Sequence, residues 1–260
     1  MKAQNRDLRI QIAKIVHKAR EGHIPSSYSI VDILHCIYDK VLKYDKANLN
    51  WKDRDYFILS KGHGALALYV ILKKFGIISQ KYLDDYSQAK SILGGHPDRT
   101  KVPGAEASTG SLGHGFPIAA GLAMGLKIKK KKNKVIVLLG DGECHEGTIW
   151  ETAHVCNNLK LGNLCAIIDW NRSGEQLLPE DKMISKWKSF GWNTHLVDGH
   201  NEKNIYKVFK KISFNYDKKP NVIIANTTKG KGVSFIEGHG PWHHKIPDFE
   251  ELNKIIKELS

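Results

Sequence analysis

Short apolar runs alternate with amphipathic segments through the second half of the chain. The strand-like runs are 134–140, 164–169, 194–199 and 221–226, and helix-like patterns occupy 148–159, the region near 180–190, and 201–215. Strands that are almost continuously apolar and alternate with helices are typical of a parallel sheet covered on both faces. We therefore predict an α/β fold, a parallel sheet with helices on both faces.

The first half is predicted to be mainly helical. Leu8, Ile12 and Val16 fall at helical spacing, so a helix is expected over the first twenty residues, ending near Gly22. Further expected elements are a turn at 23–29, a helix up to Val41 capped by Ser29, a strand at 56–60, and helices at 65–75 and 118–128. Residues 87–117 are rich in glycine, proline and serine, and a loop of this length inside a domain is usually functional.

Length and composition indicate an ordinary globular chain. It has 260 residues, 41% of them hydrophobic and 26% charged, and no linker divides it. A single domain over 1–260 is the simplest prediction. No apolar stretch is long enough to cross a membrane, and the charged N-terminus lacks the apolar centre of a signal peptide. Four cysteines without a CxxC pair favour reduced thiols, so we expect a cytoplasmic location and no membrane partner.

The formal net charge of +13 raises the question of nucleic-acid binding. Lysines are spread over many segments, and the one dense run, 127–134, precedes a strand as a solvated helix end would. No aromatic residues are interleaved with it. We therefore expect no nucleic acid as a partner, and phosphate-bearing ligands or an acidic protein explain the charge equally well.

Two polar segments follow neighbouring strand-like runs. "GDGECHEG" (140–147) leaves one run, and "DWNRSGEQ" (169–176) leaves the next. Because the carboxyl ends of parallel strands share one edge of a sheet, Asp141 and Asn171 are expected to meet there. Their oxygens, with the backbone carbonyl of Ser173, are ligands that Mg²⁺ prefers. An isolated GDG is commonly only a turn. Here flanking glycines, and a helix that begins near Thr148, also favour a bound diphosphate.

The spacing from GDG to this asparagine resembles the signature of thiamine diphosphate enzymes, and further segments resemble transketolase along nearly the whole chain. They are "EGHIPSSYSIVDIL", "LSKGHGALALY", "GGHPD", "STGSLGHG", "GDGECHEGTIWETA", "DWNR", "WKSFGW", "VDGHN", "TTKGKGVSF" and "WHHK". More narrowly, the chain resembles the N-terminal subunit of a split transketolase. The resemblance implies the thiamine diphosphate-binding fold and transfer of a two-carbon ketol unit from a ketose or ketose phosphate to an aldose.

The resemblance also implies roles for individual residues. Those implied to be catalytic are His23, His63, His96 and His243. Those implied to bind thiamine diphosphate are His63, Gly110, Ser111, Leu112, Gly142, Glu143, Glu146, Asn171 and His243. Asp141, Asn171 and Ser173 are implied to hold Mg²⁺ or another divalent cation such as Ca²⁺ or Mn²⁺. Glu146 and Glu151 match carboxylates of the family's subunit interface, although acids in the first turn of a helix are also common without such a role.

A transketolase needs more than this chain contains. The family's glutamate that activates the cofactor belongs to a pyrimidine-binding domain, for which 260 residues leave no room. The resemblance therefore implies a separate C-terminal subunit with that domain and a further one, in an α2β2 assembly that acts on sugars or sugar phosphates. We expect this chain to be inactive alone.

Three departures from the family pattern accompany the resemblance. Pro25 and two serines follow "EGH" in place of small glycine-rich residues, and His244 occupies a common glycine position. Ser173 and Glu175 replace apolar residues beside the cofactor, a role that Leu177 or Leu178 could take. Two alternatives remain, an α-type subunit of a 2-oxo acid dehydrogenase and a non-catalytic basic binding module. Of the other histidines, His17, His35, His154 and His195 are expected at the surface or in the core, and His114, His145, His200, His239 and His244 are unassigned.

Overall fold

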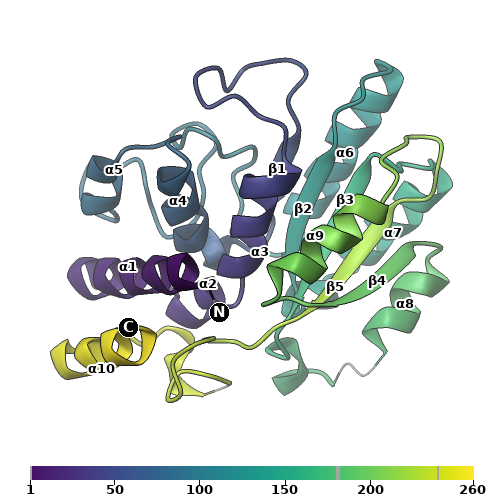
Figure 1. The fold of residues 1–260 in the computed structure, drawn as a ribbon. Coiled ribbons are helices and arrows are strands. Elements are labelled where there is room, and N and C mark those ends of the chain that lie inside the picture. The colour runs from purple at the N-terminus through teal and green to yellow at the C-terminus, as the bar shows by residue number, and fades with distance from the viewer. Residues whose placement is uncertain (1, 180–181, 239) are drawn as a thin grey trace.

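A parallel sheet forms the centre of the computed structural model, which describes residues 2–179, 182–238 and 240–260; His239 lies outside them. The described strands are ordered β1-β2-β3-β5-β4 and all pair in parallel (Figure 1). Their bounds are Tyr56–Leu59 (β1), Val135–Gly140 (β2), Leu164–Trp170 (β3), Asn193–Asp198 (β4) and Asn221–Asn226 (β5). The predicted parallel α/β sheet is confirmed, and each predicted strand forms.

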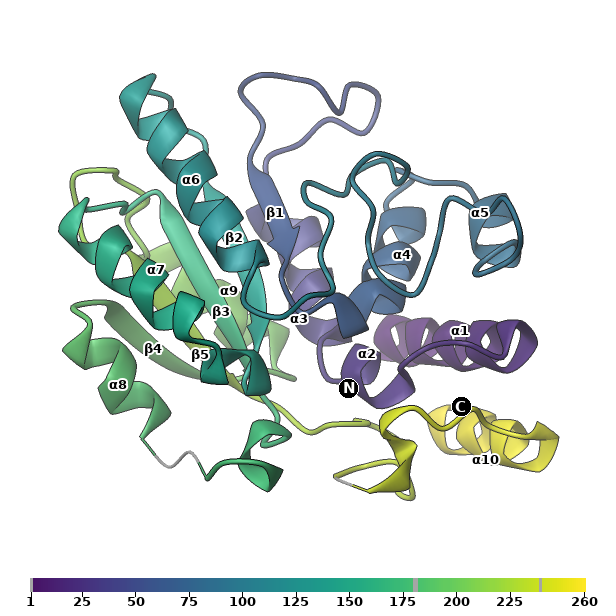
Figure 2. The same ribbon diagram turned by 180° about the vertical axis from the view of Figure 1, so that it is seen from behind.

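Helices cover both faces of the sheet. On one face lie α6 (Gly115–Ile128), α7 (Gly147–Asn158) and α8 (Met183–Ser189) (Figure 2). On the other lie α3 (Val31–Cys36), continued by a π-helical turn at Ile37–Val41, and α9 (Glu202–Lys211) (Figure 1). A helical layer beside β1 contains α1 (Ala3–Ala19), α2 (Ile24–Tyr28), α4 (Ala65–Lys74), α5 (Gln80–Asp84) and α10 (Phe249–Leu259). Within the described residues, every helix is too short or too polar to span a membrane.

Alternate strand residues enter two separate cores. In β2, Ile136 and Leu138 pack into the core shared with α1, α3 and α4, while Val137 and its alternate neighbours pack into the core with Phe116 and Trp187. Successive strand side chains point to opposite faces, so a strand between two cores is apolar at every position. This is the reason for the continuous apolar runs in the sequence.

The segment after α1 differs from the prediction. Residues 24–28 form the short helix α2 where a turn was expected, and α3 begins at Val31 without any side-chain cap. The expectation that Ser29 caps this helix was wrong. Its hydroxyl donates to Asp169 Oδ2 at 2.7 Å, because the fold brings the buried end of β3 next to it. This bond directs the Ser29 side chain toward β3, and α3 has no side-chain cap hydrogen bond.

Other elements follow the expected pattern with shifted bounds. The helix predicted at 118–128 starts earlier, at Gly115, and the helix predicted over 201–215 ends at Lys211. Besides α2, two further helices were not predicted from the sequence: α5, and the C-terminal α10, which has a capping box formed by Asp248 and Glu251. The predicted long loop is confirmed, since residues 85–114 contain neither helix nor strand.

Candidate functional site

The loops after β2 and β3 meet at the carboxyl edge of the sheet. Asp141 N donates to the backbone oxygen of Asp169 at 3.3 Å, which joins the two strand ends. A methyl group added at Gly174 would lie 2.8 Å from Gly142 Cα, so the two backbones are in direct contact. Two short 3₁₀ turns, Gly142–His145 and Gly174–Gln176, carry this contact. The predicted convergence of the two loops is therefore present.

The carboxylate of Asp141 is buried at the point where the two loops meet. The residue is 4% exposed, and its Oδ1 accepts a hydrogen bond from Gly142 N at 2.7 Å. Its Oδ2 is buried and has no hydrogen-bond partner among the described residues. Burial raises the pKa of Asp141, and the nearby Asp169 charge raises it further, while the backbone amides of Gly142 and Gly174 act in the opposite direction. A buried, unsatisfied carboxylate oxygen is costly unless a ligand completes it, and a cation is the ligand that this charge favours.

The Asn171 amide is oriented by its neighbours. Its Nδ2 donates to Asp169 Oδ2 at 2.9 Å, and its Oδ1 accepts from Ser173 N at 3.0 Å. Together with the Asp141 carboxylate and the Ser173 carbonyl, this gives the hard oxygen donors that suit Mg²⁺. Across the described ranges, no three His, Cys, Asp or Glu side chains are grouped to hold a metal. A cation at this place would be bound by carboxylate, amide and backbone carbonyl oxygens together, and the residues present supply all three.

Asp169 is the polar centre beneath this edge, and it was not predicted from the sequence. Its side chain is fully buried and forms an ion pair with Lys61 Nζ at 2.5 Å. The Ser29 and Thr227 hydroxyls also donate to its carboxylate, at 2.7 and 2.5 Å. The available signal was its position as the first charged residue after the apolar run "LCAII".

Two buried lysines point to an anion at the same edge. Lys61 is 5% exposed and Lys229 is 4% exposed. Lys229 Nζ lies 2.7 Å from Ser173 Oγ and 3.0 Å from His243 Nδ1. Burial lowers the pKa of Lys229, and the charge of Lys61 lowers it further. A bound polyanion would offset both effects, which fits a diphosphate. The family-like segments "SKGHG" and "TTKGKG" contain both lysines, but neither was singled out.

The four predicted histidines come together above this edge. The His63 ring lies 4.7 Å from His23, 5.4 Å from His96 and 6.0 Å from His243, between ring centroids. His23 Nδ1 donates to the backbone oxygen of His243 at 3.2 Å. His244, which was unassigned, joins the cluster at 4.6 Å from His23. Five imidazoles from four segments of the chain therefore line one area.

Their shared environment favours the neutral imidazole. Burial lowers the pKa of His63 to about 4, and the neighbouring His23 and His96 contribute. Burial also lowers the pKa of His23 and of His243. A neutral imidazole has one ring nitrogen that can accept a hydrogen bond from a bound hydroxyl compound.

The glycine-rich loop with Gly110, Ser111 and Leu112 is fixed from below. The Thr109 hydroxyl donates to the Leu59 carbonyl at 2.6 Å, so the loop is attached to the end of β1. A methyl group added at Gly110 would lie 2.9 Å from the His96 ring, which places this loop against the histidine cluster.

The three predicted glutamates have different surroundings. Glu143 is 1% exposed, and its carboxylate accepts from the Ser60 hydroxyl and from Gly113 N at 3.0 Å. It thus supports the glycine-rich loop from inside the protein. Glu146 and Glu151 are exposed at the beginning of α7.

The structure accounts for the departure from the family pattern at Glu175. This residue forms an ion pair with Arg172 at 2.9 Å, and the Arg172 guanidinium lies 3.4 Å over the Trp170 ring. Its carboxylate is therefore neutralised within its own loop. Leu177 and Leu178, suggested as apolar replacements, are 85% and 59% exposed.

The segment after "EGH" contacts the site through its backbone. The Ser26 carbonyl accepts from Lys61 Nζ at 3.1 Å, and the Pro25 carbonyl accepts from Gly230 N at 3.1 Å. Neither of these two contacts uses the Pro25 or Ser26 side chain, whereas the Ser29 hydroxyl farther along the segment donates to Asp169.

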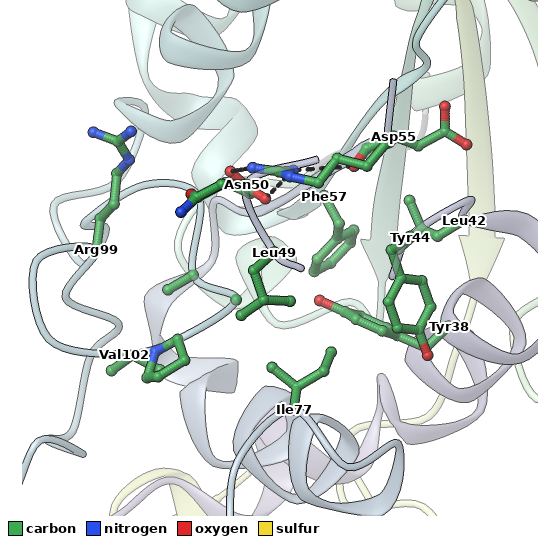
Figure 3. Close-up of a pocket in the computed structure, with 15 residues that line it drawn as sticks. Tyr38, Leu42, Tyr44, Leu49, Asn50, Asp55, Phe57, Ile77, Arg99 and Val102 are labelled. Carbon is green, nitrogen blue, oxygen red and sulfur yellow. Dashed lines mark hydrogen bonds and ion pairs between the residues drawn. The ribbon is translucent and has the colours of Figure 1, made fainter. Parts of the chain in front are cut away.

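A cavity of about 330 Å³ lies at the other end of β1, away from these groups. Figure 3 shows Tyr38, Leu49, Phe57, Ile77 and Val102 around it. Two of its charged side chains are paired with each other, since Arg54 Nη2 donates to Glu106 Oε2 at 3.0 Å. The buried Asp141 carboxylate and Lys229 ammonium lie instead at the carboxyl edge of the sheet.

Comparison with known proteins identifies the family. Residues 2–256 match the family model described as transketolase, thiamine diphosphate binding domain. The chain is 40% identical over 265 residues to a subunit of apulose-4-phosphate transketolase from Phocaeicola vulgatus, covering all of this chain and 94% of that one. It is 36% identical to a 6-deoxy-6-sulfo-D-fructose transketolase subunit of Clostridium sp., covering 94% of this chain and 90% of that one.

A solved transketolase structure from Pichia stipitis matches with a TM-score of 0.91 at 25% identity. The match covers all of this chain but only 41% of that one, so the chain spans well under half of the longer transketolase. Between the cofactor enzymes considered from the sequence, these matches favour transketolase over the 2-oxo acid dehydrogenase. The chain belongs to the transketolase family, of which it is the thiamine diphosphate-binding part.

Proposed function

We propose that this chain is the thiamine diphosphate-binding subunit of a two-subunit transketolase, which transfers a two-carbon ketol unit from a ketose or its phosphate to an aldose. Relatives that are themselves named transketolase subunits match it over nearly their full length. Their names specify a sugar phosphate and a sulfo-sugar. A polar, anion-bearing sugar is therefore the substrate class that we propose.

The observation that carries the proposal is Asp141 Oδ2, which lies where the two loops meet and has no hydrogen-bond partner in the part of the chain that the structure describes. We assign a divalent cation, Mg²⁺ or alternatively Ca²⁺ or Mn²⁺, to Asp141, Asn171 and the Ser173 carbonyl. The diphosphate is assigned to Gly142, His63, His243 and the two buried lysines, and the rest of the cofactor to Gly110, Ser111 and Leu112. Glu143 supports this loop, and Glu146 is assigned to the cofactor side of the subunit interface.

Thiamine diphosphate, when bound, supplies carbanion chemistry at its thiazolium ring. This chain binds and orients the cofactor, and its histidines interact with the hydroxyl protons of the sugar. We assign His23, His63, His96 and His243 to the catalytic group that faces the sugar. Because burial keeps His63 and His23 neutral, one ring nitrogen of each can accept a hydrogen bond from a sugar hydroxyl.

The remainder of the enzyme is assigned to a second chain. We propose that a separate C-terminal subunit supplies the pyrimidine-binding domain, that the whole of residues 1–260 acts as one cofactor-binding domain, and that the assembly is α2β2. Glu146 and Glu151, exposed on α7, are the proposed interface carboxylates. We place the enzyme in the cytoplasm, where its buried thiols would stay reduced, with neither nucleic acid nor membrane as a partner.

The test is reconstitution. The purified chain, the candidate partner and their mixture are assayed for two-carbon transfer with thiamine diphosphate and Mg²⁺, using several ketose phosphates as donors. Transfer is expected only in the mixture and is expected to be lost with EDTA. Full activity of this chain alone would contradict the two-subunit proposal, and an inactive but cofactor-binding mixture would contradict the assigned reaction.

A further inference from the structure

The backbone that carries Lys229 is held by a histidine that the mechanism above does not use. Thr228 N donates to His200 Nε2 at 2.9 Å, immediately before Lys229 in the chain. His200 lies in the loop between β4 and α9, and the side chain of Lys229 reaches Ser173 and His243. The His200 imidazole thus links the loop between β4 and α9 to the backbone next to Lys229, whose ammonium lies in the site.

The contacts of His200 define its tautomer. A backbone N–H can only donate, so Nε2 must be free of hydrogen to accept from Thr228. Nδ1 lies 2.9 Å from Asp32 Oδ2, a carboxylate oxygen that accepts. Nδ1 therefore carries the hydrogen, and only the neutral Nδ1–H imidazole satisfies both partners.

Asp32 is fixed firmly enough to select that tautomer. It is 1% exposed, and its carboxylate accepts from Arg9 Nη2 at 2.6 Å and from Asn5 Nδ2 at 2.6 Å. Burial works against ionisation, but the hydrogen bond from His200 and the charge of Arg9 hold the pKa of Asp32 below its usual range. A buried ionised carboxylate with three donors leaves the imidazole little rotational freedom.

We propose that His200, fixed by Asp32 as the neutral Nδ1–H imidazole, is a positioning residue that sets the Thr228–Lys229 backbone and thereby places the Lys229 ammonium at the anion site. This inference rests on the proposed function, in which the anion is the cofactor's diphosphate. Both ring nitrogens of His200 are engaged by Asp32 and Thr228, so the imidazole acts on the anion site through the Thr228 backbone.

A matched pair of substitutions separates positioning from general stability. In His200→Gln the amide oxygen can take the place of Nε2 and accept from Thr228 N. In His200→Asn the shorter amide can take only the place of Nδ1, so it donates to Asp32 and leaves Thr228 N unpaired. Each variant loses one of two hydrogen bonds, so similar losses of folding stability are expected.

Affinity for thiamine diphosphate with magnesium chloride is then measured by calorimetry on the full chain and both variants, each mixed with the candidate partner subunit. His200→Gln is expected to stay within about threefold of wild type, and His200→Asn to bind at least about tenfold more weakly. Equal affinities in all three proteins, or losses in both variants that simply follow stability, would overturn the inference alone. Absence of binding by the mixture of wild-type chain and partner would overturn the proposed function and this inference with it.

A ligand-independent readout tests the tautomer directly. Long-range ¹H–¹⁵N spectra of the labelled chain near pH 7.5 should show protonated Nδ1 and bare Nε2 for His200, assigned as the signal missing from His200→Gln. The Nε2–H tautomer, or a doubly protonated ring, would overturn the proposed arrangement.

Discussion

Several charged side chains are buried at the carboxyl edge of the sheet, and only some of them are paired with an opposite charge. Lys61 and Asp169 neutralise each other, whereas Asp141 Oδ2 has no hydrogen-bond partner among the described residues. Lys229 is buried beside Ser173 and His243, neither of which is anionic. In such sites the groups that bind the ligand commonly lower the folding stability of the ligand-free protein. At the scale of single residues, folding stability and ligand binding can be measured separately in variants.

Asp141→Asn should separate stability from cofactor binding. The substitution removes a buried charge, so the free energy of unfolding without ligand is expected to stay the same or rise by up to about 1 kcal/mol. The same change removes the proposed metal carboxylate. Thermal unfolding with and without Mg²⁺ and thiamine diphosphate should show a ligand-induced shift for wild type and none for the variant. An undiminished shift in the variant would contradict the metal assignment.

Lys61→Met should be strongly destabilising, because it leaves the Asp169 carboxylate buried without its cation. Breaking a buried ion pair typically costs about 3–5 kcal/mol, so a loss near 3 kcal/mol is expected by urea denaturation. The matched control is Lys61→Met combined with Asp169→Asn, which removes both charges and should recover part of the loss. A double variant less stable than Lys61→Met would show that the pair is not the cause.

At the scale of elements, the site depends on how closely two turns approach. The 3₁₀ turn at Gly142–His145 follows β2, and the turn at Gly174–Gln176 follows β3. Adjacent parallel strands bring their carboxyl ends to one edge, and the two glycines allow the backbones to touch there. The two glycines are not equivalent, because there is less room for an added Cβ at Gly174 than at Gly142.

Substitutions at these two glycines should differ accordingly. A Cβ at Gly174 would lie 2.8 Å from Gly142 Cα, whereas a Cβ at Gly142 would lie 3.6 Å from Gly174 Cα, an ordinary contact. Gly174→Ala should therefore lower the free energy of unfolding by about 1–3 kcal/mol, as overpacking does. Gly142→Ala, the control, should change it by less than about 0.5 kcal/mol. Chemical denaturation of the ligand-free chain measures both, and equal losses would contradict the asymmetry.

At the scale of the whole molecule, the histidine cluster makes folding stability depend on pH. His63 has a folded-state pKa of about 4, below its ordinary value of 6.5, because of burial and its histidine neighbours. Between these two values the unfolded chain binds more protons than the folded one. Stability therefore rises with pH across this window and is lost as pH falls from 6.5 toward 4. The pKa values of His23 and His243 shift in the same direction.

The measurement is the free energy of unfolding from urea titrations at several pH values between about 7 and about 5. Wild type should lose stability steadily on acidification, and His63→Asn should lose less over the same range. A variant with the wild-type slope would show that His63 does not carry this dependence.

Much of the fold was predictable because it has local, periodic signals. Continuous apolar runs predicted the strands, and the glycine-rich stretch predicted the long loop. The Ser29 cap was predicted wrongly, since a serine before a helix looks the same whether its hydroxyl caps the helix or reaches Asp169. The C-terminal helix α10 was missed although Asp248 and Glu251 form its capping box.

The candidate site was predictable where residues belong to motifs. Asp141 and Asn171 follow apolar runs, and the resemblance supplied the four clustered histidines. Lys61, Asp169 and Lys229 were missed because an isolated lysine or aspartate has no periodic pattern, and most such residues are at the surface. Only their burial distinguishes them, and burial depends on distant segments.

The sequence by itself determined which segments are strands, helices and loops, and which family motifs they carry, because these depend on neighbouring residues. The tertiary structure decided which polar groups meet. Ser29, Lys61, Asp169 and Thr227 are brought together from four segments by the parallel crossovers of the sheet. In that water-poor interior their charges interact strongly, and there Asp141 is left with an oxygen for a ligand to complete.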